Sequence, residues 1–125
     1  MANINIGEAE LEIMKVVWKS DEPIGSAAIG KAVEEKGWKR TTIATFLARL
    51  VEKGALSAEK RGKAWYYKPV LTAKEYKKSQ VRSLIKNLFD GSAENLVAAL
   101  FEEEQFSDKD MQELKAIFED REGRS

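Results

Sequence analysis

Hydrophobic residues recur with a helical period between Trp38 and Gly54. Five apolar residues there are spaced three or four positions apart, or are adjacent, which places all five along one side of an α-helix. The five are Ile43, Phe46, Leu47, Leu50 and Val51. A glycine just beyond the last periodic position commonly takes the left-handed conformation that closes a helix, so Gly54 predicts the C-terminus. The segment is therefore predicted to be an amphipathic helix that buries this stripe in a core.

The opposite face of this predicted helix carries small side chains where a solvated helix usually carries long charged ones. Its members are Thr41, Ala44, Thr45, Ala48 and Arg49, and Lys39 and Arg40 precede them. Hydroxyl, methyl and cationic groups suit the major groove of DNA, and small residues allow close approach. An equally open interpretation is that the alanines pack on a neighbouring helix and the threonines act as caps. The first interpretation gives these candidate DNA-binding residues: Lys39, Arg40, Thr41, Thr42, Thr45 and Arg49.

Two shorter helices are predicted ahead of this one. Residues 9–19 carry apolar side chains in one row, which is typical of a helix that faces a core. Residues 27–36 form the second helix, with Ser26 as its N-cap and Gly37 as its terminator. A Gly-containing turn then leads to the helix described above. This is the arrangement of a helix-turn-helix, whose second helix is the recognition helix.

The periodicity changes from 3.6 to two after the recognition helix. Residues 56–59 alternate between apolar and polar, and residues 64–68 are rich in strand-forming aromatic side chains. The segment 60–63, Lys-Arg-Gly-Lys, supplies a basic turn between them. A helix-turn-helix followed by a hairpin is a winged helix, in which Arg61 and Lys63 would reach phosphates or a minor groove. The alternative is a surface hairpin with solubilising charges on its turn.

Three further helices are predicted in the C-terminal part. The first begins at a capping box formed by Thr72 and Glu75 and extends to about Asp90, and Ser92 and Ser107 cap the next two. Their apolar positions, the candidate dimerisation residues, are Leu84, Ile85, Leu88, Phe89, Leu96, Val97, Leu100, Phe101, Met111, Leu114, Ile117 and Phe118. About 50 residues are too few for a comfortable separate core, which favours packing against a second subunit. The alternative is that these helices fold back over the first domain.

The predicted fold is mainly α with a small β-hairpin. A winged helix-turn-helix DNA-binding domain occupies residues 1–72, and a helical dimerisation domain occupies residues 73–125. A homodimer would present two recognition helices to half-sites one DNA turn apart, about 34 to 36 Å, or a multiple of it.

Charge is balanced over the whole chain but not along it. Lys and Arg together number 21, as do Asp and Glu, so the net charge is zero. Residues 36–68 carry nine basic and two acidic residues, a local charge of +7, which leaves −7 for the rest. A basic segment between acidic flanks is typical of a nucleic-acid footprint, and the same charges would also suit a solvated face.

The residue types that are missing narrow the function classes. The chain has no cysteine and no histidine, which excludes disulfides, thiolate nucleophiles and most zinc or copper sites, and removes the usual acid–base catalyst. We therefore predict no enzyme activity, no catalytic residue, no metal and no cofactor. No segment approaches membrane-spanning length and no secretory signal pattern opens the chain, so a cytoplasmic location without membrane insertion is expected.

The sequence resembles the penicillinase and methicillin-resistance repressors, the BlaI/MecI family, with its copper-responsive CopY branch. The resemblance covers nearly the whole chain and is carried by AELEIMKVVW, GWKRTTIATFLARLVEKGAL and the aromatic strand WYYKP. It implies a cytoplasmic homodimeric repressor. In such a protein an N-terminal winged helix binds a double-stranded DNA operator with inverted-repeat symmetry, and a C-terminal helical domain dimerises.

Three departures from the family pattern bear on specificity and regulation. The antibiotic-resistance branch commonly carries Lys and Arg at the positions of Thr41 and Ala44, which implies a different operator here. That branch is inactivated when a membrane sensor-protease cuts an Asn-Phe bond, and the matched bond in this chain is Ala99-Leu100. The resemblance thus implies either no proteolytic induction or a protease of another preference. The copper branch carries a C-terminal cysteine cluster, and this chain has no cysteine.

These observations lead to a hypothesis of repression by occupancy, in which a homodimer covers an operator that overlaps a promoter. The alternative from a different class is a winged-helix protein-interaction adaptor without sequence-specific DNA binding, because fold alone does not fix function. The basic recognition helix and wing favour DNA.

Overall fold

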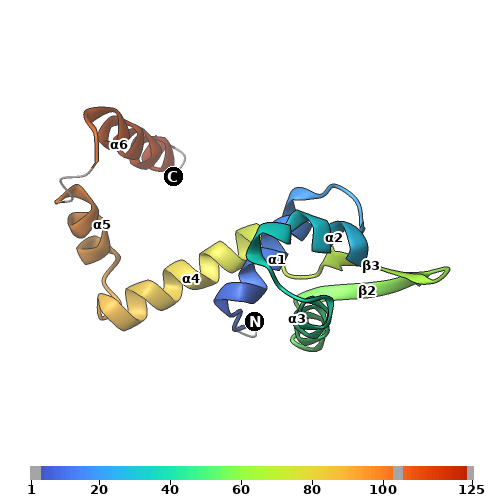
Figure 1. Cartoon of the computed structure of the whole chain (residues 1–125). Helices are drawn as coiled ribbons and strands as arrows, with labels where there is room; N and C mark the ends of the chain where they lie inside the picture. Colours follow the sequence, from blue (N-terminus) through green and yellow to red (C-terminus); the bar gives the residue numbers. More distant parts are fainter. Residues whose placement is uncertain (1–3, 103–105, 124–125) are drawn as a thin grey trace. The chain divides into compact units, whose positions relative to one another are not determined.

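The predicted alternation of helix, hairpin and helix is present in the computed structural model, which describes residues 4–102 and 106–123. Side chains are described as far as Ile117. Phe118, one of the candidate dimerisation residues, therefore lies outside the residues whose side chains are described. Within those limits the elements are α1 (Glu8–Lys19), β1 (Ile24–Gly25), α2 (Ser26–Ala32), a 3-10 turn (Glu34–Lys36), α3 (Arg40–Glu52), β2 (Leu56–Arg61), β3 (Ala64–Pro69), α4 (Ala73–Leu88), α5 (Ala93–Phe101) and α6 (Asp108–Gly123) (Figure 1). The chain divides into two compact units, residues 1–80 and 81–125.

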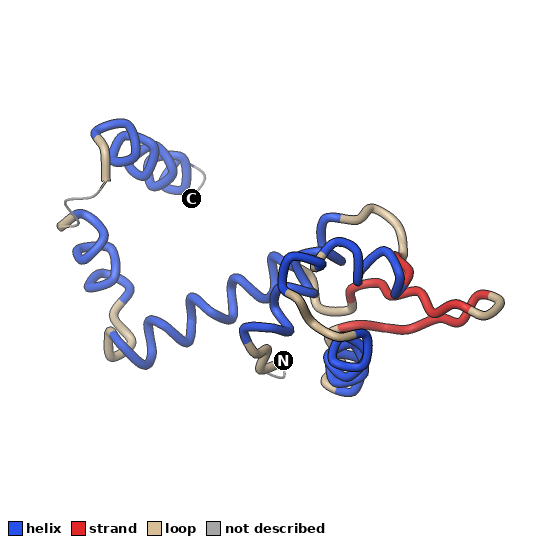
Figure 2. The backbone as a smooth tube through the Cα atoms, in the orientation of Figure 1, coloured by secondary structure: helices blue, strands red, loops and turns tan. Residues whose placement is uncertain are grey.

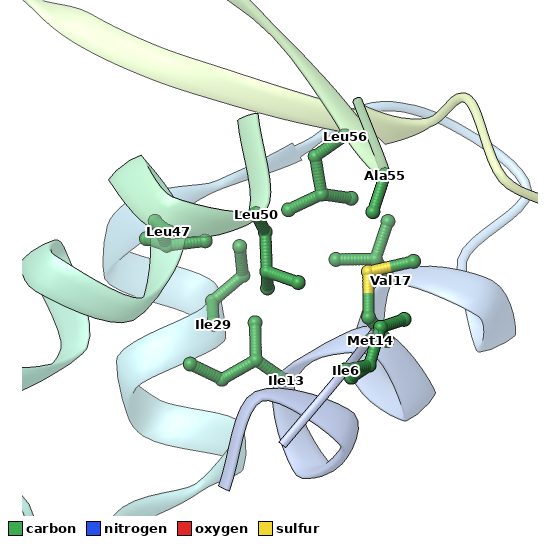
Figure 3. Packing of buried hydrophobic residues seen from close by; sticks show 9 residues of the cluster. All are labelled: Ile6, Ile13, Met14, Val17, Ile29, Leu47, Leu50, Ala55 and Leu56. Atoms are coloured by element: carbon green, nitrogen blue, oxygen red, sulfur yellow. The ribbon is translucent and has the colours of Figure 1, made fainter. Parts of the chain in front are cut away.

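One cluster of buried side chains holds the first unit together. It joins three helices to the start of the hairpin, and Figure 3 shows its members converging: Ile6, Ile13, Met14, Val17, Ile29, Leu47, Leu50, Ala55 and Leu56. The predicted stripe of α3 lies here, with Leu47 and Leu50 fully buried and Ile43, Phe46 and Val51 packed at its edge. Burial of this stripe fixes the rotation of α3 and so decides which of its residues face solvent.

The end of α3 agrees with its glycine signal, but neither end of α2 agrees with the prediction, because Gly37 ends the 3-10 turn that follows α2 and not α2 itself. Gly37 and Gly54 both have left-handed backbones, with φ of 70° and 85°. Ser26 is the first residue of α2 and not its N-cap; the cap is Gly25, whose extended backbone also pairs with β3. Because Val33 leaves helical geometry to enter the core, α2 stops at Ala32.

The hairpin belongs to a three-stranded antiparallel sheet in the order β1-β3-β2, where the sequence predicted two strands (Figure 2). The predicted four-residue basic turn is also shorter, because Arg61 pairs with Ala64 and leaves a two-residue turn, Gly62-Lys63. Side chains alternate across a strand, so this register decides which wing residues share a face.

The two faces of the hairpin have different compositions. The inner face, which continues from the core, consists of Leu56, Ala58, Lys60, Trp65, Tyr67 and Pro69. The outer face consists of Ser57, Glu59, Arg61, Ala64, Tyr66 and Lys68. Burial raises the pKa of the half-buried Tyr67 on the inner face. The wing is therefore two-sided, and its basic residues are divided between the sides.

The first turns of α4 belong to the first unit. The predicted capping box is present: the Glu75 amide donates to Thr72 Oγ1 and the Thr72 amide donates to Glu75 Oε1, both at 3.1 Å. The indole of Trp18 donates to the Leu71 carbonyl at 2.9 Å and its ring contacts Tyr76, with centroids 5.8 Å apart. The split between the units consequently falls inside α4, and the domain assignment 1–72 and 73–125 stays a prediction.

The second unit consists of helices with well-defined ends and little internal burial. Ser92 and Ser107 cap α5 and α6 as predicted, each accepting a hydrogen bond at 3.1 Å from the amide three residues on. Among the side chains described from residue 81 onward, none is fully buried. Leu88 and Ile117 are 70% and 59% exposed, and Leu84 is 38% exposed. The other described candidates are half-buried: Ile85, Phe89, Leu96, Val97, Leu100, Phe101, Met111 and Leu114.

Candidate nucleic-acid interface

The exposed face of α3 carries the small residues that the sequence placed there. Thr41, Ala44, Thr45 and Ala48 are exposed, while Thr42 is half-buried. The Thr45 hydroxyl donates to the Thr41 carbonyl at 2.9 Å, so its hydrogen is engaged by the helix itself. The face therefore offers mainly methyl groups at close approach, which suits contact with thymine methyl groups in a major groove.

Three cations flank this face. Lys39 is the N-cap of α3, Arg40 begins the helix and Arg49 lies in its last turn. All three are exposed and, within the described part of the chain, none forms an ion pair. Positive charge at a helix N-terminus opposes the helix dipole, which favours anions there by a few tenths of a kcal/mol or more. Lys39 and Arg40 thus contribute nothing evident to folding, and the same position is suited to a phosphate.

Other basic residues of the segment 36–68 are paired inside the first unit. Lys36 contacts Glu12 at 3.4 Å. Lys53 contacts the carboxylate of Glu10 and donates to the Asn5 carbonyl at 2.8 Å. Sequence reasoning missed the pairing of Lys53 with Glu10, because the two residues lie 43 positions apart. Lys36 and Lys53 are therefore basic residues with a structural role, in contrast to the basic residues that remain free to contact a ligand.

The Lys53 pair is a partly buried tie between the start of α1 and the end of α3. Glu10 is only 5% exposed and its Oε1 also accepts the Gly7 amide at 2.8 Å. Burial by itself raises the pKa of Glu10, but hydrogen bonds from Lys53 and Gly7, with the charges of Lys53 and Arg49, outweigh it and leave the pKa lowered. The tie stabilises the position of the last turn of α3, where Arg49 lies.

A groove of about 810 Å³ runs beside the recognition helix. Its walls come from α2, α3 and β3, and include Ala27, Lys31, Arg40, Thr41, Ala44, Trp65 and Tyr67. Trp38 also lines the groove and contacts Phe46 edge-on, with ring centroids 5.2 Å apart. Two of the candidate residues of α3, Arg40 and Thr41, therefore share one concave surface with Trp65 and Tyr67 of the wing, whereas Lys39, Thr42, Thr45 and Arg49 do not line it.

The two predicted wing residues lie in different settings. Lys63 is exposed at the turn. Arg61 lies on the outer face, where its guanidinium contacts Glu59 at 3.2 Å and lies over the Tyr66 ring at 5.0 Å from the centroid. Sequence reasoning missed Lys60 and Trp65 as site residues. The strand alternation that begins at residue 56 could have assigned Lys60 to the inner face, and the pairing of Lys60 with Trp65 then places Trp65 there too.

The remaining candidate concerns regulation and lies in the second unit. Ala99 is exposed and Leu100 half-buried, and both lie within α5. The matched bond is thus inside a hydrogen-bonded helix. No helix in the described residues is long and apolar enough to cross a bilayer.

Comparison with known proteins bears on this surface. The family model for penicillinase repressors matches residues 6–120. The penicillinase repressor of Bacillus licheniformis is 32% identical over 95% of this chain and 93% of its own length. The methicillin resistance regulatory protein MecI of Staphylococcus aureus (strain N315) is 27% identical over 90% of this chain and 91% of its own.

A solved structure resembles the first unit. It is the monomeric form of Bacillus licheniformis BlaI in complex with the blaP half-operator. The match has a TM-score of 0.51 at 37% identity, and it covers 60% of this chain and 92% of that one. The predicted fold class and family are confirmed. The chain belongs to the penicillinase repressor family.

Proposed function

We propose that this protein is a sequence-specific transcriptional repressor that binds a double-stranded DNA operator as a homodimer. The observation that carries the proposal is the exposed face of α3, where small side chains are flanked by Lys39, Arg40 and Arg49, all without ion pairs among the described residues. The relative of known structure in complex with a half-operator, BlaI, supports the same partner class.

The mechanism assigns different tasks to the two ends of α3. The N-terminal residues of a recognition helix usually contact base edges, so Thr41, Thr42, Ala44 and Thr45 would contact bases. Lys39 and Arg40 would hold the flanking backbone, because phosphates accept strong hydrogen bonds from cations. Arg49 lies in the last turn and would neutralise a phosphate. Sequence preference should therefore come from the first two turns of the helix.

Dimerisation is proposed for the second unit because its apolar side chains have no core of their own. Residues that a soluble monomer would cover remain exposed, including Leu88 and Ile117. Packing against the same helices of a second copy would bury them in a two-fold interface. Joining two recognition helices raises the effective concentration of the second at its half-site, which strengthens binding without new contacts. The preferred operator should then be an inverted repeat.

Repression would follow from occupancy of a promoter-overlapping operator by this dimer. A membrane sensor-protease that requires Asn-Phe would not release it, because the matched bond is Ala99-Leu100 inside α5. A protease partner is therefore proposed only with a preference that accepts this bond and a mechanism that opens the helix.

The test is selection of randomised duplex DNA by the full chain at about 150 mM salt, followed by sequencing of the retained fraction. At this salt concentration weak phosphate-only binding is largely suppressed. Recovery of an inverted repeat is the expected result. Recovery of no preferred sequence would overturn the proposal and would favour the protein-interaction adaptor.

A further inference from the structure

Two neighbouring cations of the wing point to opposite sides. Lys60 and Arg61 are consecutive in β2, and the ladder pairs them with Trp65 and Ala64. The ammonium of Lys60 lies 6.0 Å from the centroid of the Trp65 ring on the inner face. Arg61 is on the outer face with Glu59 and Tyr66. The two neighbouring positive charges therefore lie in different environments, Lys60 on the inner face and Arg61 on the outer face.

The inner face has the features of a surface that meets an anion. Within the described chain Lys60 forms no ion pair, whereas Arg61 is partly neutralised by its carboxylate neighbour. Trp65 is 45% exposed and lines the groove beside α3. Lys31 of α2 also lines that groove and has no ion pair in the described residues, and Glu34 lines it as well. A lysine and an exposed aromatic ring that line one groove, with Lys60 next to that ring, complement a sugar–phosphate chain, whose sugars are apolar and whose phosphates are anionic.

We infer that the groove between α2, α3 and the wing holds one sugar–phosphate strand of the operator. Lys60 and Lys31 contact its phosphates, Trp65 lies against its sugars, and Arg61 takes no part. This inference rests on the proposed function and adds to it the side of the wing that faces DNA. It assigns the phosphate contact of the wing to Lys60 and not to Arg61, which the sequence analysis favoured. Burial of Trp65 by the strand would also remove an exposed indole from water.

The adjacent cations provide a matched pair of variants, Lys60→Gln and Arg61→Gln, in the full chain. Both remove one positive charge from an exposed position of the same strand, so their effects on folding should be alike. The probes are a duplex carrying the selected inverted repeat and a scrambled duplex of the same composition. Binding to each is measured from about 50 to 300 mM salt, which gives the slope of log K against log salt.

Lys60→Gln should lower the salt slope by about one unit and weaken binding about fivefold at 150 mM salt on both duplexes. Arg61→Gln should leave the slope unchanged. Equal losses in the two variants, or a loss confined to Arg61→Gln, would overturn the inference. A wild-type protein that does not distinguish the two duplexes would overturn sequence-specific repression, and the slopes on either duplex would still test which wing face meets DNA.

A second measurement follows Trp65 directly. Acrylamide quenches exposed indoles, and the difference between the wild type and Trp65→Phe isolates the contribution of this residue from those of Trp18 and Trp38. Saturation with the scrambled or selected duplex should abolish that difference, because the strand covers the ring. A Trp65 contribution that stays fully quenchable in the bound state would contradict the assigned position of the strand. Near-identical far-UV circular dichroism of all variants controls for folding.

Discussion

The two units of this chain bury their apolar side chains in opposite ways. In the first, Ile13, Met14, Ile29 and Leu50 have no exposed surface and belong to one cluster. In the second, Leu88 and Ile117 leave more than half of their surface exposed, and no described side chain from residue 81 onward is fully buried. Side-chain caps begin helices in both units, at Thr72 in the first and at Ser92 and Ser107 in the second. A well-specified helix and a self-sufficient core are therefore separate properties, and only the first unit has both.

Removal of core volume should have the largest effect. Leu50→Ala deletes a fully buried side chain at the centre of the cluster and should lower the free energy of unfolding by about 2–5 kcal/mol. Urea unfolding of the full chain at one fixed protein concentration measures the loss. Leu50→Met conserves volume and should cost less than about 1.5 kcal/mol. Equal costs for the two variants would contradict a tightly packed core at this position.

A charge on the uncovered face should separate the subunits and leave the first unit folded. Leu88→Glu places a carboxylate at the most exposed apolar side chain of α4. Sedimentation equilibrium should then report a monomer, and operator affinity should fall about 100-fold as effective concentration is lost. The matched control is Asn87→Glu, which adds the same charge at an exposed neighbouring position. A Leu88→Glu dimer of undiminished affinity would place the interface elsewhere.

Local signals explain which features could be predicted from the sequence. The caps at Thr72, Ser92 and Ser107 act through hydrogen bonds to residues three positions away, so the residues themselves report them. The apolar period of α3 likewise determined its buried and exposed faces. This was enough for the fold class and for the recognition helix.

Long-range pairing explains what was missed. The strand β1 has two residues and exists only because Ile24 and Gly25 pair with β3, more than 40 positions later. The Glu10–Lys53 tie is equally distant in sequence. The inner face of the wing was different, because alternation from residue 56 already assigns Lys60 to it. The sequence analysis assigned residues 60–63 to a turn. Because turn residues do not alternate between two faces, the side of the sheet on which Lys60 lies was not recognised.

The recognition helix allows a smaller test within the first unit. Arg49→Ala should lower the salt slope of operator binding by about one unit and weaken binding about fivefold at 150 mM salt. Preference among operator variants should stay the same, because Arg49 lies in the last turn of α3, away from the residues expected at base edges. Titration of a panel of single-base operator variants measures this. A loss confined to one operator position would instead assign Arg49 to base recognition.

The smallest expected effect is a change in the pH dependence of stability, again confined to the first unit. The pKa of Glu10 is lowered in the folded chain from its ordinary value of 4.5, so the folded state favours the carboxylate. The resulting stabilisation is present above pH 4.5 and is lost as pH falls through the lower folded-state pKa. In Glu10→Gln this loss is absent, so the wild-type advantage in unfolding free energy should shrink between about pH 6 and pH 3.5. Glu8→Gln is the control, because Glu8 is exposed and has no ion pair among the described residues. Parallel pH profiles for the wild type and Glu10→Gln would show that the tie between α1 and α3 is not coupled to folding, and Arg49 would then depend on the core alone for its position.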